Sequence, residues 1–255
     1  MSSAPIPLSC IIIAFNEADR ISKTLSSVEG LVDEIVVIDS GSTDGTQDVC
    51  THHGARVVHN DWPGYGPQKR YAEDCAIHDW VLNLDADEVL TEPLRDEIWA
   101  WRTAGVPEYS GYRFRQTTVY PGHEKPRPFA DYHHYVRLYD RREMRFHESL
   151  VHDTVDTKGK PVGIFEGECW HWSWRSLDHL ARKLDGYTTL QAKEIRKPGW
   201  VLWLRRPVEY PWLLFRYIFF KRHITGGWYG LKAAHTLAWG RAKRIGKVLA
   251  AQRAA

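Results

Sequence analysis

The first 90 residues alternate between short apolar runs and segments whose apolar positions recur at helical spacing. Continuous apolar runs of this length predict buried strands, here at residues 8–14, 34–38, 55–58 and 80–84. Helices are predicted between them: one carries Ile21, Leu25 and Val28, one runs from Thr46 to His53, and one follows the loop at 62–67. Asp19 or Asn16 is expected to cap the first helix. Strands and helices that alternate with short links predict an α/β fold, a mostly parallel sheet with helices on both faces.

The pattern changes after residue 90. A helix is predicted from Pro93 to Ala104, and β-structure at 112–115, 134–139 and 144–147, with a Gly/Pro-containing loop at 121–128. A further helix is predicted from Asp178 to about Lys193. We therefore expect a first domain at residues 1–175 and a helical, basic, aromatic C-terminal extension at 176–255.

Charge divides the chain, although its net charge is only +2. Residues 1–170 hold 17 Lys and Arg against 28 Asp and Glu, whereas residues 171–255 hold 17 against four. Within the basic part, residues 200–206 and 210–220 mix aromatic side chains with Arg and Lys and are too short and too charged to span a bilayer. They predict helices lying on an anionic membrane surface. The alternative is ordinary helices packed on the domain. We expect no nucleic-acid partner, because no recognisable binding motif accompanies the basic residues.

Two further features bear on location. The four cysteines show no C-x-x-C spacing, which is typical of reduced thiols in the cytosol. The N-terminus has no basic segment followed by a long apolar run, so no signal peptide is expected.

Polar residues follow three of the predicted strands, after Ile13, Ile38 and Leu84. In a parallel sheet these strand ends share one edge, where ligands bind. Asp85 and Asp87 are spaced i, i+2 and so face the same side of an extended strand. Such carboxylates repel each other unless a cation, commonly Mg²⁺ or Mn²⁺, lies between them. Asp-x-Asp alone is more often an acidic turn, but three clusters at one edge favour a metal and diphosphate site. A G-x-G-x-x-G motif is absent, which favours a mononucleotide over a dinucleotide.

Together, three segments resemble the landmarks of family-2 inverting glycosyltransferases with the GT-A fold, over roughly residues 8–175. The segments are Ala14-Phe15-Asn16-Glu17, Asp39-Ser40-Gly41-Ser42-Thr43-Asp44 and Asp85-Ala86-Asp87. More narrowly, four segments and the basic tail are similar to bacterial lipopolysaccharide core glucosyltransferases: residues 66–70, 84–88, 151–153 and 171–176. That subgroup usually has Val-His-Glu where this chain ends in Asp153, which keeps the carboxylate but shortens its reach.

The resemblance implies a role for each matching residue. The donor nucleotide would be bound by the first two segments, by two cations and by part of the third segment: Ala14, Phe15, Asn16, Glu17, Asp39, Ser42, Asp44, Lys69, Arg70, Asp85 and Ala86. Asp87 would ligate the metal, with His171 as a further ligand. His152 is the alternative to His171, which could also be a packed core residue. Asp153 would be the general base, with Glu148 and Asp131 as alternatives.

The resemblance implies a metal-dependent inverting transferase that uses Mg²⁺ or Mn²⁺. It would move a hexose, glucose first, from a nucleoside-diphosphate sugar such as UDP-glucose to a glycolipid acceptor, the lipopolysaccharide inner core. We expect it to lie peripherally on the cytoplasmic face of the inner membrane. A sugar-nucleotide nucleotidyltransferase would need a glycine-rich basic loop after the first strand, and Phe15-Asn16-Glu17-Ala18 is neither. A non-catalytic nucleotide-binding membrane scaffold requires loss of a metal ligand or base, whereas Asp85, Asp87 and Asp153 are all present.

Overall fold

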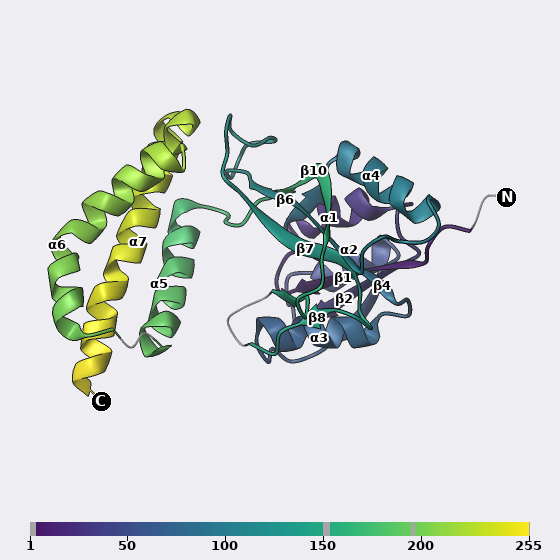
Figure 1. Cartoon of the computed structure of the whole chain (residues 1–255), viewed down its shortest axis with the longest axis horizontal. Coiled ribbons are helices and arrows are strands. Elements are labelled where there is room, and N and C mark those ends of the chain that lie inside the picture. The colour runs from purple at the N-terminus through teal and green to yellow at the C-terminus, as the bar shows by residue number, and fades with distance from the viewer. Residues whose placement is uncertain (1–3, 150–153, 195–196, 255) are drawn as a thin grey trace. The chain divides into compact units, whose positions relative to one another are not determined.

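The computed structural model describes residues 4–149, 154–194 and 197–254. They form two compact units, each discontinuous in sequence (Figure 1). Unit 1 comprises residues 1–117 and 132–171, and unit 2 comprises residues 118–131 and 172–255. The segment 118–131 therefore leaves unit 1 between two strands and packs with the C-terminal helices.

Unit 1 is built on an eight-stranded sheet. In spatial order its strands are β3 (Arg56–His59), β2 (Glu34–Asp39), β1 (Leu8–Ala14), β4 (Trp80–Asp85), β7 (Tyr132–Asp140), β6 (Gly111–Thr118), β10 (Gly163–His171) and β5 (Glu88–Leu90). From β3 to β4 the strands are parallel, and the pairs β4–β7, β7–β6 and β10–β5 are antiparallel. The predicted α/β fold is confirmed, and so are the four N-terminal strands to within one residue at each end. The three-residue strand β5 was not predicted.

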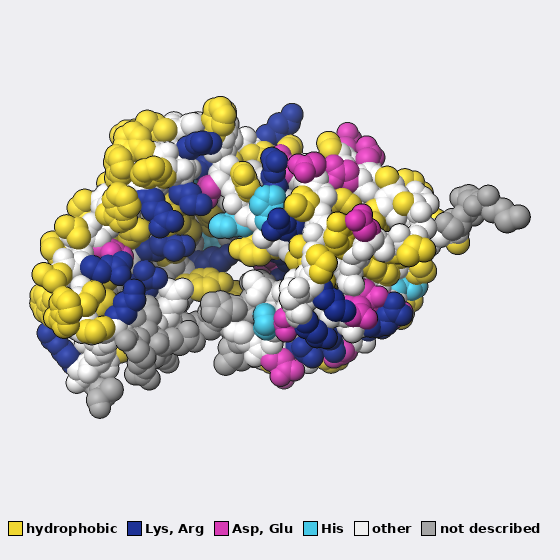
Figure 2. All heavy atoms as spheres, viewed as in Figure 1, with side chains coloured by type: hydrophobic (Ala, Val, Ile, Leu, Met, Phe, Trp, Pro, Cys, Tyr) yellow, Lys and Arg dark blue, Asp and Glu magenta, His cyan; other side chains and the backbone are white. Residues whose placement is uncertain are grey.

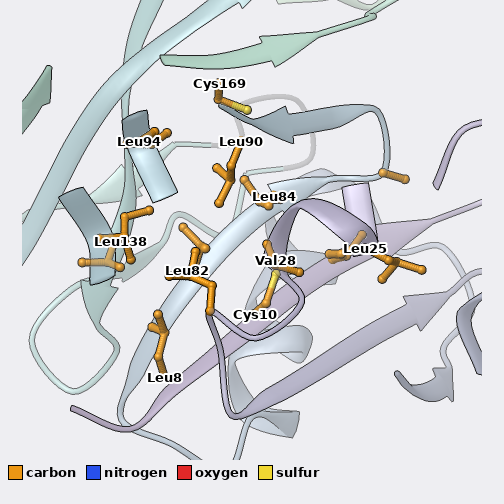
Figure 3. Packing of buried hydrophobic residues seen from close by; sticks show 14 of the residues in the cluster. Leu8, Cys10, Leu25, Val28, Leu82, Leu84, Leu90, Leu94, Leu138 and Cys169 are labelled. Carbon is orange, nitrogen blue, oxygen red and sulfur yellow. The ribbon is translucent and has the colours of Figure 1, made fainter. Parts of the chain in front are cut away.

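Helices cover both faces of this sheet, as predicted. They are α1 (Ile21–Val28), α2 (Thr46–His52), α3 (Tyr65–Cys75) and α4 (Glu92–Thr103). On one face, apolar residues of α1 and α4 pack on Leu8, Leu82 and Leu84 (Figure 3). On the other face, Ala72 of α3 packs with Tyr139 and with a small second sheet. That sheet pairs β8 (Arg145–Phe146) with β9 (Val155–Asp156).

The predicted cap of α1 is wrong. Arg20 occupies the N-cap position and no side chain caps the helix. The Asn16 side chain instead accepts a hydrogen bond from the Thr43 N–H, at 2.9 Å. Asn16 is therefore used to join two loops rather than to start a helix.

Unit 2 packs α5 (Leu177–Glu194) and α6 (Gly199–Phe215) against the long helix α7 (Gly227–Ala254). A π-helix, η1 (Arg216–Phe220), and a 3₁₀ helix, η2 (His223–Gly226), connect α6 to α7. The predicted helical extension is confirmed. The first aromatic stretch and residues 210–215 of the second belong to one helix, α6, which continues through Pro207 and Pro211, and residues 216–220 form η1. Buried Leu202, Ile245 and Val248 hold α6 to α7. None of the described helices is both long enough and apolar enough to cross a membrane.

Candidate functional site

The three polar segments meet at one edge of the sheet. β1 lies between β2 and β4, and the register places Ala14 opposite Asp39 and Ile13 opposite Asp85. The strands therefore end at the same level, and the residues that follow them emerge side by side. The predicted convergence at the carboxyl edge is confirmed.

Hydrogen bonds lock the loop after β1 to the loop after β2. Asn16 adopts a left-handed backbone conformation, with φ 54°, which asparagine tolerates better than most residues. Its N–H donates to Ser42 Oγ at 2.8 Å. The N–H of Glu17 donates to Thr46 Oγ1 at 2.8 Å, and the N–H of Ala18 donates to Asp44 Oδ2 at 3.1 Å. The small hydroxyl and carboxyl residues after β2 thus fix the shape of the loop after β1.

Asp39 is buried and turned into its own loop. Its Oδ1 accepts hydrogen bonds from the Gly41 N–H at 3.0 Å, the Ser42 N–H at 2.9 Å and Gln47 Nε2 at 2.7 Å, and its Oδ2 accepts from the Ser42 hydroxyl. Burial alone would raise the pKa of Asp39, but these donors outweigh it and hold the pKa below the usual value. The carboxylate therefore stabilises the loop, while the predicted contacts of Asp39, Ser42 and Asp44 with a nucleoside stay predictions.

The Asp-x-Asp pair is held by three cations. Asp85 Oδ1 lies 2.8 Å from Nζ of buried Lys69, and Asp85 Oδ2 lies 3.2 Å from Arg137 Nη2. Asp87 Oδ2 lies 3.2 Å from Arg20 Nη1. Burial would raise the pKa of Asp85, but Lys69 and Arg137 hold it well below the usual value. At neutral pH both carboxylates are therefore charged and compensated.

His171 completes the cluster from β10, which β7 and β6 separate from β4 in the sheet. It ends β10 opposite Glu88 of β5, and its Nε2 lies 3.3 Å from Asp87 Oδ1. Burial would lower the pKa of His171, but the Asp87 carboxylate raises it above the usual value. The structure therefore brings together Asp85, Asp87 and His171, as predicted.

These three side chains fit a divalent metal. One ligand atom from each of Asp85, Asp87 and His171 lies within 4.8 Å of the others. Two carboxylates and one imidazole suit Mg²⁺ or Mn²⁺, and Mg²⁺ commonly takes only one or two carboxylates and completes its shell with water and phosphate oxygens. A metal here would compete with the cations that already neutralise the carboxylates.

A second layer of charged residues lies behind the cluster. Buried Glu88 accepts hydrogen bonds from the Asp85 N–H at 3.1 Å, from Arg137 Nη2 at 2.8 Å and from the Gln116 amide. Burial raises the pKa of Glu88 to about 8. Arg137 also donates to Asn83 Oδ1 at 2.6 Å. Sequence reasoning missed this layer, although a buried asparagine inside an apolar strand signals a polar partner.

Arg20 was also missed. Its Nη2 donates to Glu17 Oε1 at 2.8 Å, and its Nε contacts the other Glu17 oxygen. Because Arg20 also reaches Asp87, it bridges Glu17, a predicted nucleotide-binding residue, to the predicted metal ligand Asp87. The signal was the i, i+3 spacing of Glu17 and Arg20, which places opposite charges side by side in a helical turn.

Comparison with known proteins now places the chain. The model of the glycosyl transferase family 2 matches residues 9–101. An uncharacterised glycosyltransferase of Rickettsia felis is 34% identical over 94% of this chain and 89% of its own length. The lipopolysaccharide core biosynthesis glycosyltransferase LpsC of Rhizobium meliloti is 30% identical over 85% of this chain and 80% of its own length. The chain belongs to glycosyl transferase family 2.

A solved structure gives a weaker likeness to this family-2 glycosyltransferase. Glucosyl-3-phosphoglycerate synthase of Mycobacterium tuberculosis, in complex with Mn²⁺, UDP and glucosyl-3-phosphoglycerate, is 27% identical. The match covers 46% of this chain and 45% of that chain, with a TM-score of 0.34.

The predicted cations of the transferase differ in what they contact. Lys69 is fully buried, pairs with Asp85 and lies 5.0 Å from the centroid of the Phe146 ring. Arg70 donates from Nη1 to the Phe146 carbonyl oxygen at 2.9 Å, and its Nε lies 3.3 Å from Glu148 Oε1. Lys69 therefore belongs to the carboxylate cluster, whereas Arg70 holds the segment that follows β8.

That segment leads to the predicted base. Asp153 and the alternative ligand His152 lie outside the described residues, between β8 and β9. Of the alternatives, Glu148 pairs with Arg70, and Asp131 of unit 2 pairs with Arg127 at 2.9 Å. All three carboxylates stay predictions for the role of base.

Gly66 brings α3 close to the same segment. Its N–H donates to the Ser149 carbonyl oxygen at 3.1 Å. A Cβ on Gly66 would lie 2.1 Å from the His147 carbonyl oxygen and 2.6 Å from that of Ser149. Only glycine fits there without moving the backbone that precedes Asp153.

A cavity of about 190 Å³ lies in unit 1. It is lined by residues of β7 and by the start and end of the β8–β9 connection: His134, Tyr135, Val136, Arg137, Phe146, Thr154 and Val155. Arg137 belongs both to this lining and to the carboxylate cluster. Arg137 therefore contributes to both the cavity and the candidate metal site.

Proposed function

We propose that this family-2 glycosyltransferase moves a hexose, glucose first, from a nucleoside-diphosphate sugar such as UDP-glucose to a glycolipid acceptor with inversion at the anomeric carbon. The observation that supports the donor is the convergence of Asp85, Asp87 and His171 at the shared strand ends. The similarity to LpsC favours the lipopolysaccharide inner core as the acceptor.

Each residue is given a role consistent with its position. Asp87 and His171 hold Mg²⁺ or Mn²⁺, and Asp85 holds ribose or a metal-bound water. When bound, the ion neutralises charge on the departing diphosphate. Residues 14–17, Asp39, Ser42, Asp44 and Ala86 form the nucleotide pocket, with Lys69 and Arg70 at its cationic side.

Asp153 is proposed to take the proton from the acceptor hydroxyl as that oxygen attacks the anomeric carbon. A base in this reaction must lie within hydrogen-bond reach of the acceptor. Its segment borders the cavity through Phe146 and Thr154. Residues 1–175 are thus proposed as the catalytic domain and 176–255 as the extension that meets the membrane.

An exposed apolar face on α6 supports membrane-surface association. Residues spaced by four, Trp200, Leu204, Val208 and Trp212, lie on one face of the helix, and each is more than half exposed. Figure 2 shows hydrophobic side chains gathered over α6, with Lys and Arg beside them. Aromatic and basic residues together suit the interface of an anionic membrane. We propose that the enzyme lies peripherally on the cytoplasmic face of the inner membrane.

A binding panel tests the donor. Calorimetry with UDP-glucose and other nucleoside-diphosphate sugars, with and without Mn²⁺ or Mg²⁺, should show metal-dependent binding of one donor. Asp87→Ala should abolish that dependence, whereas Asp48→Ala in α2, another Asp→Ala substitution outside the proposed site, should retain it. Metal-independent binding, or binding unchanged in Asp87→Ala, would reject the metal assignment.

Turnover tests the base. Asp153→Asn should bind the donor normally and lose about 10²–10⁴-fold in turnover, the usual contribution of a general base. Glu148→Gln is the matched variant in the same connection. A near-normal rate in Asp153→Asn would assign the base to another carboxylate.

A further inference from the structure

Two exposed residues of unit 2 hold a strained backbone conformation. Phe129, in the segment 118–131, has φ 54°, and Arg222, between η1 and η2, has φ 53°. Left-handed conformations are unfavourable for bulky residues, and such outliers cluster at functional sites. The two side chains also meet, since the Arg222 guanidinium carbon lies 5.4 Å from the centroid of the Phe129 ring. The strain is therefore concentrated at one place on the surface of unit 2.

Hydrogen bonds fix this place from its inner side. The Thr225 hydroxyl donates to the Pro128 carbonyl oxygen at 2.6 Å, across 97 residues of sequence. Nη2 of buried Arg127 donates to the Lys221 carbonyl oxygen at 2.7 Å. The segment 118–131 and the turn between α6 and α7 are therefore joined into one surface.

A π-helix gathers aromatic side chains on this turn. The i→i+5 spacing of η1 brings the rings of Phe215 and Phe220 together, with centroids 5.8 Å apart. Phe219 lies 4.9 Å from Phe215, and Trp212 lies 6.5 Å from Phe220. π-Helices are rare and occur frequently at functional sites. Here the π-helix builds a preformed cluster of four aromatic rings, which ends two residues before Arg222.

These side chains and their neighbours form what we call the aromatic tip: Phe129, Trp212, Phe215, Phe219, Phe220 and Ile224. Each is between 47% and 72% exposed. In Figure 1 the turn between α6 and α7 lies at the end of unit 2 away from the C-terminus. Exposed apolar side chains that gather in this way mark an interaction surface.

Charge and chemistry select the partner. Residues 210–228 contain Arg216, Lys221 and Arg222 and no acidic residue. A second copy of the chain would set these cations against themselves across a two-fold axis, which opposes self-association. An acidic protein would need about one hydrogen bond per 100–200 Å², whereas the only polar group on the side chains of the tip is the Trp212 N–H. An anionic bilayer offers apolar chains beneath negative headgroups and needs no such matching.

We propose that the aromatic tip inserts below the headgroups of an anionic bilayer, with Arg216 and Arg222 at headgroup level. The inference rests on the proposed function, which lays the apolar face of α6 on the membrane surface. It adds the point at which unit 2 enters the bilayer and a second chain segment, that of Phe129, which takes part. The Trp212 end of α6 then lies deeper than the Trp200 end.

Vesicle sedimentation of the full chain tests the tip. The probes are vesicles of phosphatidylcholine mixed with phosphatidylglycerol and vesicles of phosphatidylcholine alone. Phe129→Ser and Phe220→Ser should each weaken binding to the mixed vesicles about tenfold or more, because each removes apolar surface from the bilayer. Phe129→Trp should retain binding. Ile77→Ser, which removes an equally exposed apolar side chain from unit 1, should have no effect.

A matched position on α6 separates insertion at the tip from flat contact. Trp200 is as exposed as Phe220, so Trp200→Ser should weaken binding less than Phe220→Ser only if the tip lies deeper. Thermal melts check that each variant folds. Binding that is unaffected by Phe129→Ser and Phe220→Ser, or weakened more by Trp200→Ser, would overturn the tip and leave a flat α6 contact.

Three further results would also overturn the proposal. Equal binding to both kinds of vesicle would remove the anionic partner. Tip variants that change only the self-association of the chain in analytical ultracentrifugation would assign the surface to a second copy. Failure of the wild type to bind any vesicle would reject the tip together with membrane association. Binding of UDP with Mg²⁺ is measured separately, so failure of the proposed transferase shows as loss of that binding.

Discussion

Arg20 occupies the position from which a cation can compete with a metal for Asp87. The two side chains are only 16% and 10% exposed, and their charged atoms are 3.2 Å apart. At an effective dielectric constant of about 20, that separation corresponds to ~5 kcal/mol of attraction before desolvation is subtracted. A metal that binds Asp87 must weaken this pair. Arg20→Met should therefore strengthen metal binding.

The magnitude follows from the net value of such a pair. Hydrogen bonds to charged groups contribute about 1.5–3 kcal/mol net, so metal affinity should rise about 10- to 100-fold in Arg20→Met. The metal-free variant should be less stable, because removing one partner of a buried pair costs about 3–5 kcal/mol. For a chain of this size the melting temperature should fall by about 6–20 °C, and added metal should restore part of it.

Calorimetric titration with Mn²⁺ and thermal melts with and without metal measure both effects. Lys23→Met removes the same charge from an exposed position in the first turn of α1 and should leave metal affinity unchanged beyond a small long-range effect. Weaker metal binding in Arg20→Met than in the wild type would refute the competition. An unchanged melting temperature without metal would show that the Arg20–Asp87 pair contributes nothing to stability.

Three other substitutions test the interlocked loops, the close approach of α3 and the apolar face of α6. Asp39→Asn should lower the free energy of unfolding by about 1–3 kcal/mol at pH 7. Because the pKa of Asp39 is lowered on folding, this difference in stability from the wild type should shrink as the pH falls below about 4, which acid-unfolding curves measure. Gly66→Ala should lower the free energy of unfolding by about 1–3 kcal/mol through overpacking and slow turnover without weakening donor binding. Gly186→Ala, inside α5 where a Cβ meets nothing within 4 Å, should instead raise the free energy of unfolding by about 0.5–1 kcal/mol and leave turnover unchanged. Trp212→Ala should reduce binding to anionic vesicles about tenfold in a sedimentation assay. Unchanged sedimentation would favour packed helices without a membrane role. The control is Trp99→Ala, which removes a half-exposed tryptophan of α4.

The sequence predicts one half of the site well. Each of β1, β2 and β4 is a mostly apolar run, and parallel strands joined by short helical links must end at a common edge. The polar residues that follow them therefore meet, whatever the details of the loops. For this reason the positions of Asn16, Asp39 and Asp85 could be predicted without knowing a single contact.

The other half depends on pairing between distant parts of the chain. Arg137 reaches Asp85 because β7 runs antiparallel beside β4, and His171 reaches Asp87 because β10 pairs with the three-residue strand β5. Neither pairing leaves a local pattern. The course of α6 was missed for a different reason. Helices were expected at 200–206 and 210–220, whereas residues 199–215 form one helix with Pro207 and Pro211 inside it, and proline usually disrupts a helix interior.

The charge balance of the site suggests why metal and nucleotide should bind together. The carboxylates of Asp85 and Asp87 are matched by Lys69, Arg20 and Arg137 in the structure, while the raised pKa of Glu88, about 8, leaves that group largely protonated at pH 7. A divalent ion that arrives alone adds two positive charges to a cluster that is already compensated, and it must compete with these cations. An ion that arrives with a diphosphate adds almost no net charge, and the cations displaced from the carboxylates can turn to phosphate oxygens. The pairing of Lys69 and Arg20 with the acids thus disfavours the bare metal and favours the metal–nucleotide complex, so that each ligand raises the affinity for the other.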